Sequence, residues 1–322
     1  MDVGPSGFAS DEENSDRGTP SSLPDIVHDE SHFPVSLFGY RQSIDLRFNS
    51  NFREVLLCFS NLERYCDAPT ESLYERSNKC SIDVSLEEAF HFPQRISGRI
   101  PTDGERIHQI SLRNLKNMWC RLVAHYFEWI AGIPELKFFC DRDKIKLVTR
   151  QLCKVICLTV SYWTYEQNYD GVIFGSGIYF DPQQCPEGLI KNYVGSLSNV
   201  IHNGVVSTFR TIRLLRDEYI LMKLVMLFED SHDVPLSEDG RMLVDMALNK
   251  YRTALVEQSK YAHPELNHME STSRMALLFG VMPYMELLSQ LDDYHLSEIT
   301  IHNSGNMMGR LTSEIHLNSI LQ

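Results

Sequence analysis

The sequence lacks the signals of secretion and of membrane insertion. Its 322 residues contain no Asn-x-Ser/Thr acceptor, no N-terminal signal peptide and no long apolar run free of charge. Eight cysteines are present, but no two of them form a Cys-x-x-Cys pair. Cys153 and Cys157 lie one turn apart in an apolar segment, where buried free thiols are far commoner than metal ligands. We therefore expect an intracellular protein with reduced thiols, no bound metal and no contact with a membrane.

Positive charge is also scarce. The chain has 30 Lys and Arg residues against 43 Asp and Glu residues, and its formal net charge is −13. Binding to nucleic acid requires clustered Lys and Arg that neutralise phosphates. We therefore expect no direct contact with nucleic acid.

Catalytic motifs are missing as well. The chain has no His-Glu-x-x-His, no Gly-x-Ser-x-Gly and no P-loop sequence, and its 12 histidines are scattered. The Gly-Ser-Gly sequence at 175–177 is followed by neither a third glycine nor a helix start, so it is not a phosphate-binding loop. Asp141 and Asp143 are typical of a helix N-terminus rather than of an acid–base pair. The sequence therefore predicts a protein that is not an enzyme and needs no cofactor.

What is present is one large helical domain behind a polar N-terminal segment. Residues 1–23 are rich in Ser, Gly, Pro, Asp and Glu, which is typical of disorder. We assign residues 1–42 to a disordered tail or hinge remnant and residues 43–322 to the folded domain. In the domain, apolar residues recur at three- and four-residue spacing, and a Gly-Ser-Gly turn between two β-rich triplets predicts a hairpin at 172–180. We predict helices at residues 49–65, 85–92, 105–131, 141–165, 188–203, 206–228, 237–261 and 271–299.

The stretch from Trp119 to Trp163 organises this prediction. Pro134 cannot donate a backbone hydrogen bond and forces the preceding residue out of the helical region, so the first helix should end there. Asp141 or Asp143 can then cap the next N-terminus and complement its dipole. The helix that follows carries few charges, which indicates burial on most sides. A helix buried in this way needs other helices on both of its faces.

The same stretch resembles a known family signature. The sequence Glu-Trp-Ile-Ala-Gly-Ile-Pro-Glu-Leu at 128–136, followed by Phe139, Asp143 and Leu147, resembles the signature of the nuclear hormone receptor ligand-binding domain. The chain looks most like the divergent receptors of nematodes, and the resemblance covers residues 43–322. It implies an all-α, three-layer antiparallel helical sandwich with one small β-hairpin. The family's DNA-binding module holds zinc through Cys-x-x-Cys pairs, which this sequence lacks.

The resemblance also implies an apolar ligand pocket. Its positions fall on the third helix of the family, on the buried helix and on the hairpin, with His295 as a polar contact in register with Pro283. The alternative is that each of these residues belongs to the ordinary core. The implied pocket residues are Leu115, Met118, Trp119, Leu122, Leu152, Ile156, Val160, Trp163, Ile178, Phe180 and His295.

A second implied site is the groove that binds a helix of a coregulator. In the family, a C-terminal helix supplies a glutamate that caps the N-terminus of the bound helix, and here that residue is Glu314. In the family, a lysine contacts the opposite end of the bound helix; here Ala131 takes its position, and Lys144, at the start of the next helix, is the alternative cation at a distance. In the C-terminal helix, Thr312 and His316 replace apolar residues of the family pattern. The groove, called the coregulator groove below, comprises Phe127, Ala131, Lys144, Ile145, Val148, Leu311, Glu314 and Ile315.

Two functions remain open. The first is regulation of transcription in the nucleus, with the cytoplasm as a second location, through a small lipophilic ligand and a coregulator helix. The second is a ligand-independent module that forms a homo- or heterodimer through the 271–299 helix and acts as a receptor partner deficient in DNA binding. Trp163 replaces the arginine that anchors acidic ligands in some receptors, which favours a neutral ligand or a pocket filled by its own side chains. The pocket volume would distinguish the two functions.

Overall fold

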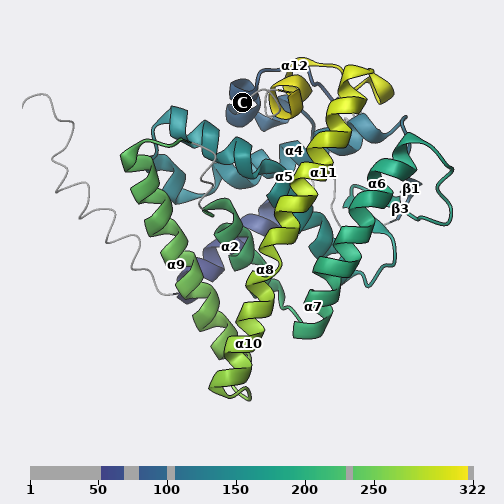
Figure 1. Ribbon diagram of the computed structural model, residues 1–322. Helices are drawn as coiled ribbons and strands as arrows, with labels where there is room; N and C mark the ends of the chain where they lie inside the picture. The colour runs from purple at the N-terminus through teal and green to yellow at the C-terminus, as the bar shows by residue number, and fades with distance from the viewer. Residues whose placement is uncertain (1–51, 69–79, 100–105, 230–234, 318–322) are drawn as a thin grey trace, which may run out of the picture. The chain divides into compact units, whose positions relative to one another are not determined.

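The computed structural model describes residues 52–68, 80–99, 106–229 and 235–317. All of them belong to the unit Leu46–Gln322. The predicted tail at 1–42 lies outside the described residues. The described part is helical apart from one small sheet, which confirms the predicted all-α class (Figure 1). None of its helices combines the length and the apolar content needed to cross a membrane.

Helix α5 (Asp141–Glu166) lies at the centre of the described fold, as the sequence predicted. The preceding helix, α4 (Leu115–Ala131), ends before Ile133, which is extended at φ −86° and ψ 113°. Pro134 then begins a 3-10 turn. Sixteen residues of α5 are buried, because helices pack on both of its sides.

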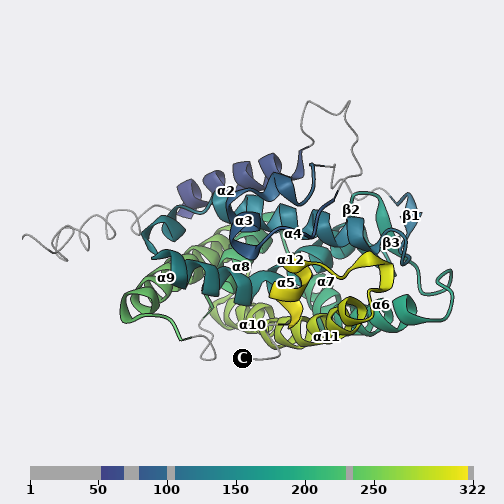
Figure 2. The ribbon, with the colours of Figure 1, turned by 90° about the horizontal axis from the view of Figure 1, so that it is seen from above.

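The helices form three layers. Figure 2 shows α2 (Phe52–Asp67) beside α4 in one outer layer and α10 (His268–Phe279) with α11 (Met282–Ile301) in the other. Between them lie α5 and α8 (Arg216–Leu227), and the direct contacts of α5 with α4, α8 and α11 agree with this order. This is the sandwich that the family resemblance implied. The remaining elements are α3 (Leu86–His91), η2 (Pro93–Arg95), η3 (Pro134–Phe138), α6 (Leu189–Val200), η4 (Ile201–Val206), α7 (Ser207–Ile212), α9 (Glu238–Ala262), η5 (Ser304–Asn306), α12 (Arg310–Thr312) and η6 (Ser313–Leu317).

The predicted hairpin is present, and it has a third strand that the sequence did not indicate. Strands β2 (Val172–Gly175) and β3 (Ile178–Phe180) pair antiparallel across a turn in which residues 175–177 all have positive φ. Strand β1 (His108–Gln109) pairs parallel with β3. The predicted start of a helix at residue 105 was therefore wrong. The backbone N–H groups of Ile107 and His108 donate to the Gly177 carbonyl, so they are not available to a helix, and α4 begins only at Leu115.

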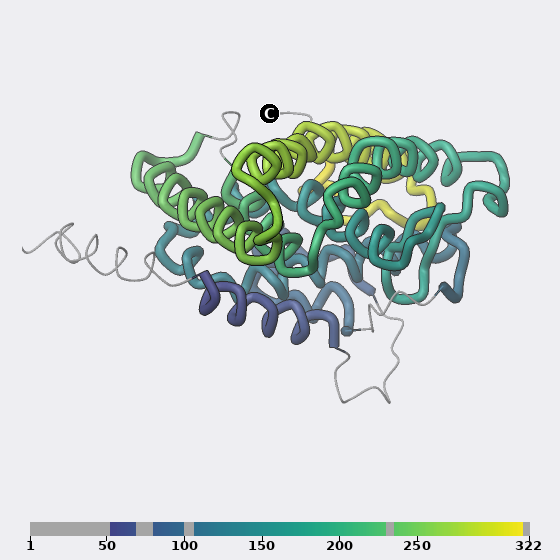
Figure 3. The backbone as a smooth tube through the Cα atoms, turned by 90° about the horizontal axis from the view of Figure 1, so that it is seen from below, coloured from purple at the N-terminus to yellow at the C-terminus, as the bar shows by residue number. Residues whose placement is uncertain are grey.

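The predicted helix break near residue 204 was also wrong. Elements α6, η4 and α7 run on continuously to Ile212, and Figure 3 shows them beside α10 and α11. A Cβ atom on Gly204 would lie 2.5 Å from the Tyr284 ring, so this glycine permits close helix packing rather than ending a helix. The chain breaks instead at Arg213, which has a left-handed φ of 50°.

The predicted helix at 271–299 is two helices. A capping box formed by Asn267 and Glu270 starts α10, and the chain breaks at Gly280–Val281 before α11. Pro283 lies in the first turn of α11, where its missing N–H costs no intrahelical bond. The prediction of one continuous helix over 271–299 was therefore wrong, because the chain breaks at Gly280, three residues before Pro283.

The start of α5 differs in detail from the prediction. The residue before α5 is Cys140, whose side chain makes no capping hydrogen bond. Asp143 accepts hydrogen bonds from the backbone N–H and the hydroxyl of Ser237, the N-cap of α9. Asp143 thus ties the beginnings of two helices together, and it complements the α5 dipole without capping it.

Candidate functional site

The interior cavity lies between α4, α5, α6, α11 and the hairpin. Its volume is about 30 Å³. That is close to the share of liquid volume taken by one water molecule and far below the 300–1,000 Å³ of typical ligand pockets. The lining residues are Met118, Trp119, Leu122, Val123, Leu152, Ile156, Cys157, Val160, Phe174, Tyr193, Leu197, Ile201, Asp292, Leu296 and His316.

Six of the residues implied for a pocket meet at this cavity. All of them come from one face of α4 and one face of α5: Met118, Trp119, Leu122, Leu152, Ile156 and Val160. The other five lie elsewhere. Leu115, Ile178 and Phe180 are buried away from the cavity, and the Trp163 ring packs against His125. His295 is half-buried with Nε2 3.1 Å from Ser196 Oγ, and burial lowers its pKa.

One end of the cavity is polar, and its centre is His316 on η6. The Trp119 indole Nε1–H donates to His316 Nε2 over 3.0 Å. Because Nε2 accepts this bond, the proton of a neutral imidazole is on Nδ1, which lies 2.7 Å from Asp293 Oδ1 and donates to it. The Ser297 hydroxyl donates to the backbone carbonyl of His316 over 2.9 Å. The imidazole, which is fully buried, therefore attaches the C-terminal segment Arg310–Leu317 to α4 and to α11.

A second carboxylate faces the same region. Tyr193 on α6 donates its hydroxyl proton to Asp292 Oδ1 over 2.6 Å. Burial raises the pKa of Asp292 to about 6, against opposing effects of His316 and Tyr193. The sequence analysis missed Asp292 and Tyr193. The available signal was the position of Asp292, which shares a helix face with Met285, Leu288, Leu296 and Ile299; an acidic residue on an apolar face indicates a buried polar partner.

Three side chains of this region could in principle ligate a metal ion. One donor atom each of Cys153, Asp293 and His316 lies within 4.8 Å of the other two. The arrangement does not fit a metal, because His316 Nδ1 carries the proton that bonds Asp293 and burial raises the pKa of the Cys153 thiol. Hydrogen bonding accounts for the cluster.

The C-terminal segment packs with its apolar side chains inward. Leu311 and Ile315 are buried, and the backbone N–H of Leu311 donates to the Ile82 carbonyl over 2.8 Å. Thr312, which replaces an apolar residue of the family pattern, is also buried and donates its hydroxyl proton to the Met307 carbonyl. Thr312 and His316 are therefore satisfied polar groups in the packed segment rather than weak points.

The other groove residues lie on α4 and at the start of α5. Phe127 is fully buried and contacts the ring of Phe90 on α3, with centroids 6.1 Å apart. Ala131 is exposed, and Lys144 pairs with Asp141 over 3.1 Å. Ile145 is half-buried, and Val148 is buried with its carbonyl accepting from Tyr126. Glu314 accepts hydrogen bonds from the backbone N–H of Leu86 and from the Arg310 side chain.

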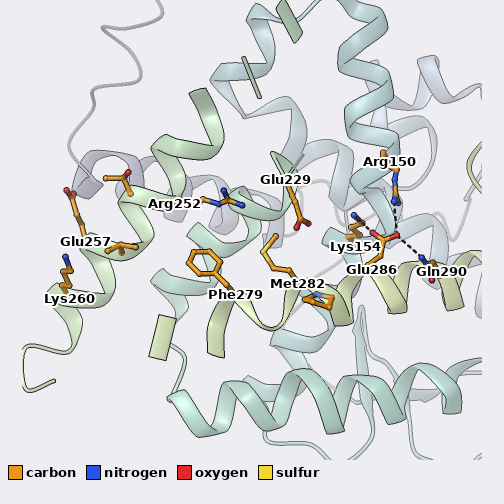
Figure 4. Close-up of a pocket in the computed structure, with 13 residues that line it drawn as sticks. Arg150, Lys154, Glu229, Arg252, Glu257, Lys260, Phe279, Met282, Glu286 and Gln290 are labelled. Atoms are coloured by element: carbon orange, nitrogen blue, oxygen red, sulfur yellow. Dashed lines mark hydrogen bonds and ion pairs between the residues drawn. The ribbon is translucent and has the colours of Figure 1, made fainter. Parts of the chain in front are cut away.

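A separate cleft opens on the surface between α9 and the α10–α11 pair. It has a volume of about 1180 Å³ and a mixed lining. Figure 4 shows Glu286 at one end, bonded to Arg150, Lys154 and Gln290, with Phe279 and Met282 along the floor. Because charged side chains contribute much of its lining and it opens to solvent, this cleft is not suited to enclosing a lipophilic molecule.

Comparison with known proteins identifies relatives of this chain. Residues 101–296 match the family model described as the ligand-binding domain of nuclear hormone receptor. The chain is 25% identical over 260 residues to nuclear hormone receptor family member nhr-100 of Caenorhabditis elegans. That alignment covers 76% of this chain and 57% of the receptor, so the chain spans little more than half of its relative's length.

Proposed function

The chain belongs to the ligand-binding domain family of nuclear hormone receptors, and from this premise we propose that it regulates transcription in the nucleus through contacts with other proteins. In this proposal the C-terminal segment stays docked without a ligand. The observation that carries it is the volume of the interior cavity, about 30 Å³.

The filled interior removes the need for a ligand to stabilise closure. A lipophilic molecule of ordinary size needs roughly ten times this volume or more. Trp119 and Tyr193 are both buried beside the cavity, and their side chains contribute to filling it. The Trp119–His316–Asp293 hydrogen bonds attach the C-terminal segment directly to the body of the domain. In a ligand-gated domain, contacts with the ligand favour the closed position of the C-terminal segment over the open one. In this proposal, side chains of the domain itself make the contacts that favour the closed position.

Closure presents Glu314 at the edge of the coregulator groove. Its Oε2 accepts a hydrogen bond from the first N–H of a short helix, which is the contact expected with a coregulator helix. The proposed partner is therefore a helical peptide of a coregulator, bound with its N-terminus at Glu314.

A ligand-gated mechanism is the second candidate. It is supported by the convergence of six implied pocket residues on one cavity, with His316, Asp292 and Tyr193 as polar contacts at one end. In that case a neutral lipophilic molecule would enter only after the side chains around the cavity rearranged.

The two candidates differ in what purified protein contains. We expect organic extraction of the protein followed by mass spectrometry to recover no stoichiometric lipid, and a lipid library to leave its melting temperature unchanged. As a control, Ile156→Ala enlarges the cavity without changing charge, and a small apolar probe should raise the melting temperature of this variant alone. A stoichiometric lipid in the wild type, or a shift of several degrees, would favour the ligand-gated mechanism instead.

Dimerisation through the α10–α11 surface is compatible with either candidate. Five large apolar side chains, from 41% to 57% exposed, lie along α10 and α11. Four of them lie on α11 at spacings of three or seven residues, which puts those four on one face of that helix, and the fifth lies on α10. They are Leu277, Tyr284, Leu287, Tyr294 and Ile301. A homo- or heterodimer partner would bury this stripe, so Leu287→Glu with Tyr294→Glu should dissociate a dimer in analytical ultracentrifugation and leave a monomer unchanged.

A further inference from the structure

Helix α3 lies on the surface that the proposed function assigns to a coregulator. Glu314 Oε2 accepts the backbone N–H of Leu86, the first residue of α3, over 2.6 Å. These two residues are 228 positions apart in the chain. The N-cap of α3 is Ser85, whose hydroxyl oxygen accepts from the Glu88 N–H over 3.1 Å. The start of α3 is thus capped twice, once by the neighbouring residue Ser85 and once by Glu314 of the C-terminal segment.

The apolar side of α3 packs on α4. Ala89 is fully buried, and the Phe90 ring meets the Phe127 ring edge to face at an interplanar angle of 86°. Just before α3, the Ile82 carbonyl accepts a hydrogen bond from the backbone N–H of Leu311, so the residues that lead into α3 contact α12. Figure 2 shows α3 over α4 and close to α12.

Helix α3 thus contacts two residues of the coregulator groove, Phe127 through a ring contact and Glu314 at its N-terminus. The apolar residues of α3 are the bulky Leu86, then, after two intervening residues, the small Ala89 and the aromatic Phe90. We propose that α3 occupies the coregulator groove intramolecularly, and that a partner helix with this pattern binds by displacing it. This inference rests on the proposed function of the groove.

The chemistry of α3 favours exchange over permanent attachment. The helix has six residues, which is too short to be stable on its own. Glu87, His91 and Phe92 are exposed, and Leu86 is only half-buried. Tethering keeps α3 near the groove at an effective concentration on the order of millimolar, so a modest intrinsic affinity is enough to hold it. A partner helix must therefore compete with the tethered one.

The test uses a peptide copied from the chain itself. Residues 82–95 are synthesised with a fluorescein label, and binding to the full chain is followed by fluorescence anisotropy. We expect weak binding to the wild type, because α3 fills the groove. Phe90→Ala removes the aromatic contact of α3 with Phe127 and should tighten peptide binding at least tenfold. Glu87→Gln changes an exposed residue of the same helix and should leave binding unchanged.

A further variant separates the inference from the proposed function. Adding Glu314→Gln to Phe90→Ala should abolish the gain, because the cap at the N-terminus of the bound helix is weakened. Equal binding to the wild type and to Phe90→Ala would overturn the inference while leaving the groove as a helix site. Absence of binding to a Phe90→Ala protein that melts cooperatively would overturn the proposed groove itself.

A measurement on the wild type covers the case in which Phe90→Ala fails to fold. Saturating isotope-labelled 82–95 peptide is added, and hydrogen exchange of the chain's own Leu86–His91 amides is followed by mass spectrometry. Displacement predicts faster exchange of these amides and unchanged exchange in α9. Unchanged exchange at Leu86–His91 with the peptide bound would show that α3 does not occupy the peptide's site, which would refute the inference.

Discussion

Replacing His316 by alanine should release the C-terminal segment without unfolding the domain. The imidazole accepts one bond from Trp119 and donates one to the Asp293 carboxylate. A neutral hydrogen bond contributes about 1 kcal/mol and one to a charged group about 1.5–3 kcal/mol. The substitution should therefore lower the free energy that holds the C-terminal segment on the domain by about 3 kcal/mol. The buried Trp119 N–H, left without its acceptor, increases this loss. A change of about 3 kcal/mol raises the equilibrium constant for local opening roughly a hundredfold.

Hydrogen exchange measures this opening directly. Amides of Arg310–Leu317 should lose about two orders of magnitude of protection in His316→Ala, and amides of α9 should keep theirs. Two further variants divide the network. The oxygen of His316→Gln can accept from Trp119 and the amide of His316→Asn can donate to Asp293, so each should restore part of the protection. Unchanged exchange of the segment in His316→Ala would refute the assignment of docking to this imidazole.

Three other predictions follow from two buried charged groups and one half-buried thiol. The pKa of Asp292 is raised from 3.8 to about 6, so its contribution to stability is fully present below pH 3.8 and is lost as pH rises through 6. Asp292→Asn removes the ionisable group, so it should raise the free energy of unfolding by about 3 kcal/mol at pH 8 and leave it unchanged at pH 3.5. Urea unfolding at the two pH values measures this difference. Arg274→Met leaves Glu218 buried without its bidentate partner and should lower the free energy of unfolding by about 3–5 kcal/mol, whereas adding Glu218→Gln should recover part of the loss. A hydrogen bond with Cys120 lowers the pKa of the Cys80 thiol to about 7, so alkylation of Cys80 by iodoacetamide should be half-maximal near pH 7 in the wild type and at higher pH in Cys120→Ala.

Local chemistry made the central part of the fold predictable. Pro134 ends α4 because of its covalent geometry, and Ser237 caps α9 through its own hydroxyl, so both can be read from a few neighbouring residues. The Gly-Ser-Gly turn of the hairpin belongs to the same class. The six cavity residues on α4 and α5 were implied by the family resemblance, and the structure places them on one face of each helix.

The features that the sequence did not predict depend on distant partners. Strand β1 exists because Gly177, some 70 residues later, accepts its N–H groups. Gly204 does not break a helix because the Tyr284 ring packs against it, and no local signal reports that. Leu86 meets Glu314 only after the whole domain has folded. The volume of the interior cavity is likewise a property of all its walls together and cannot be read from spacing.

The central claim is that the C-terminal segment Arg310–Leu317 is docked on a filled interior without a ligand. The most direct test is hydrogen exchange of this segment before and after exhaustive removal of lipid from the refolded protein. We predict the same protection in both samples, because Trp119, His316 and Asp293 form the attachment. Protection that disappears on lipid removal and returns when lipid is added back would contradict it.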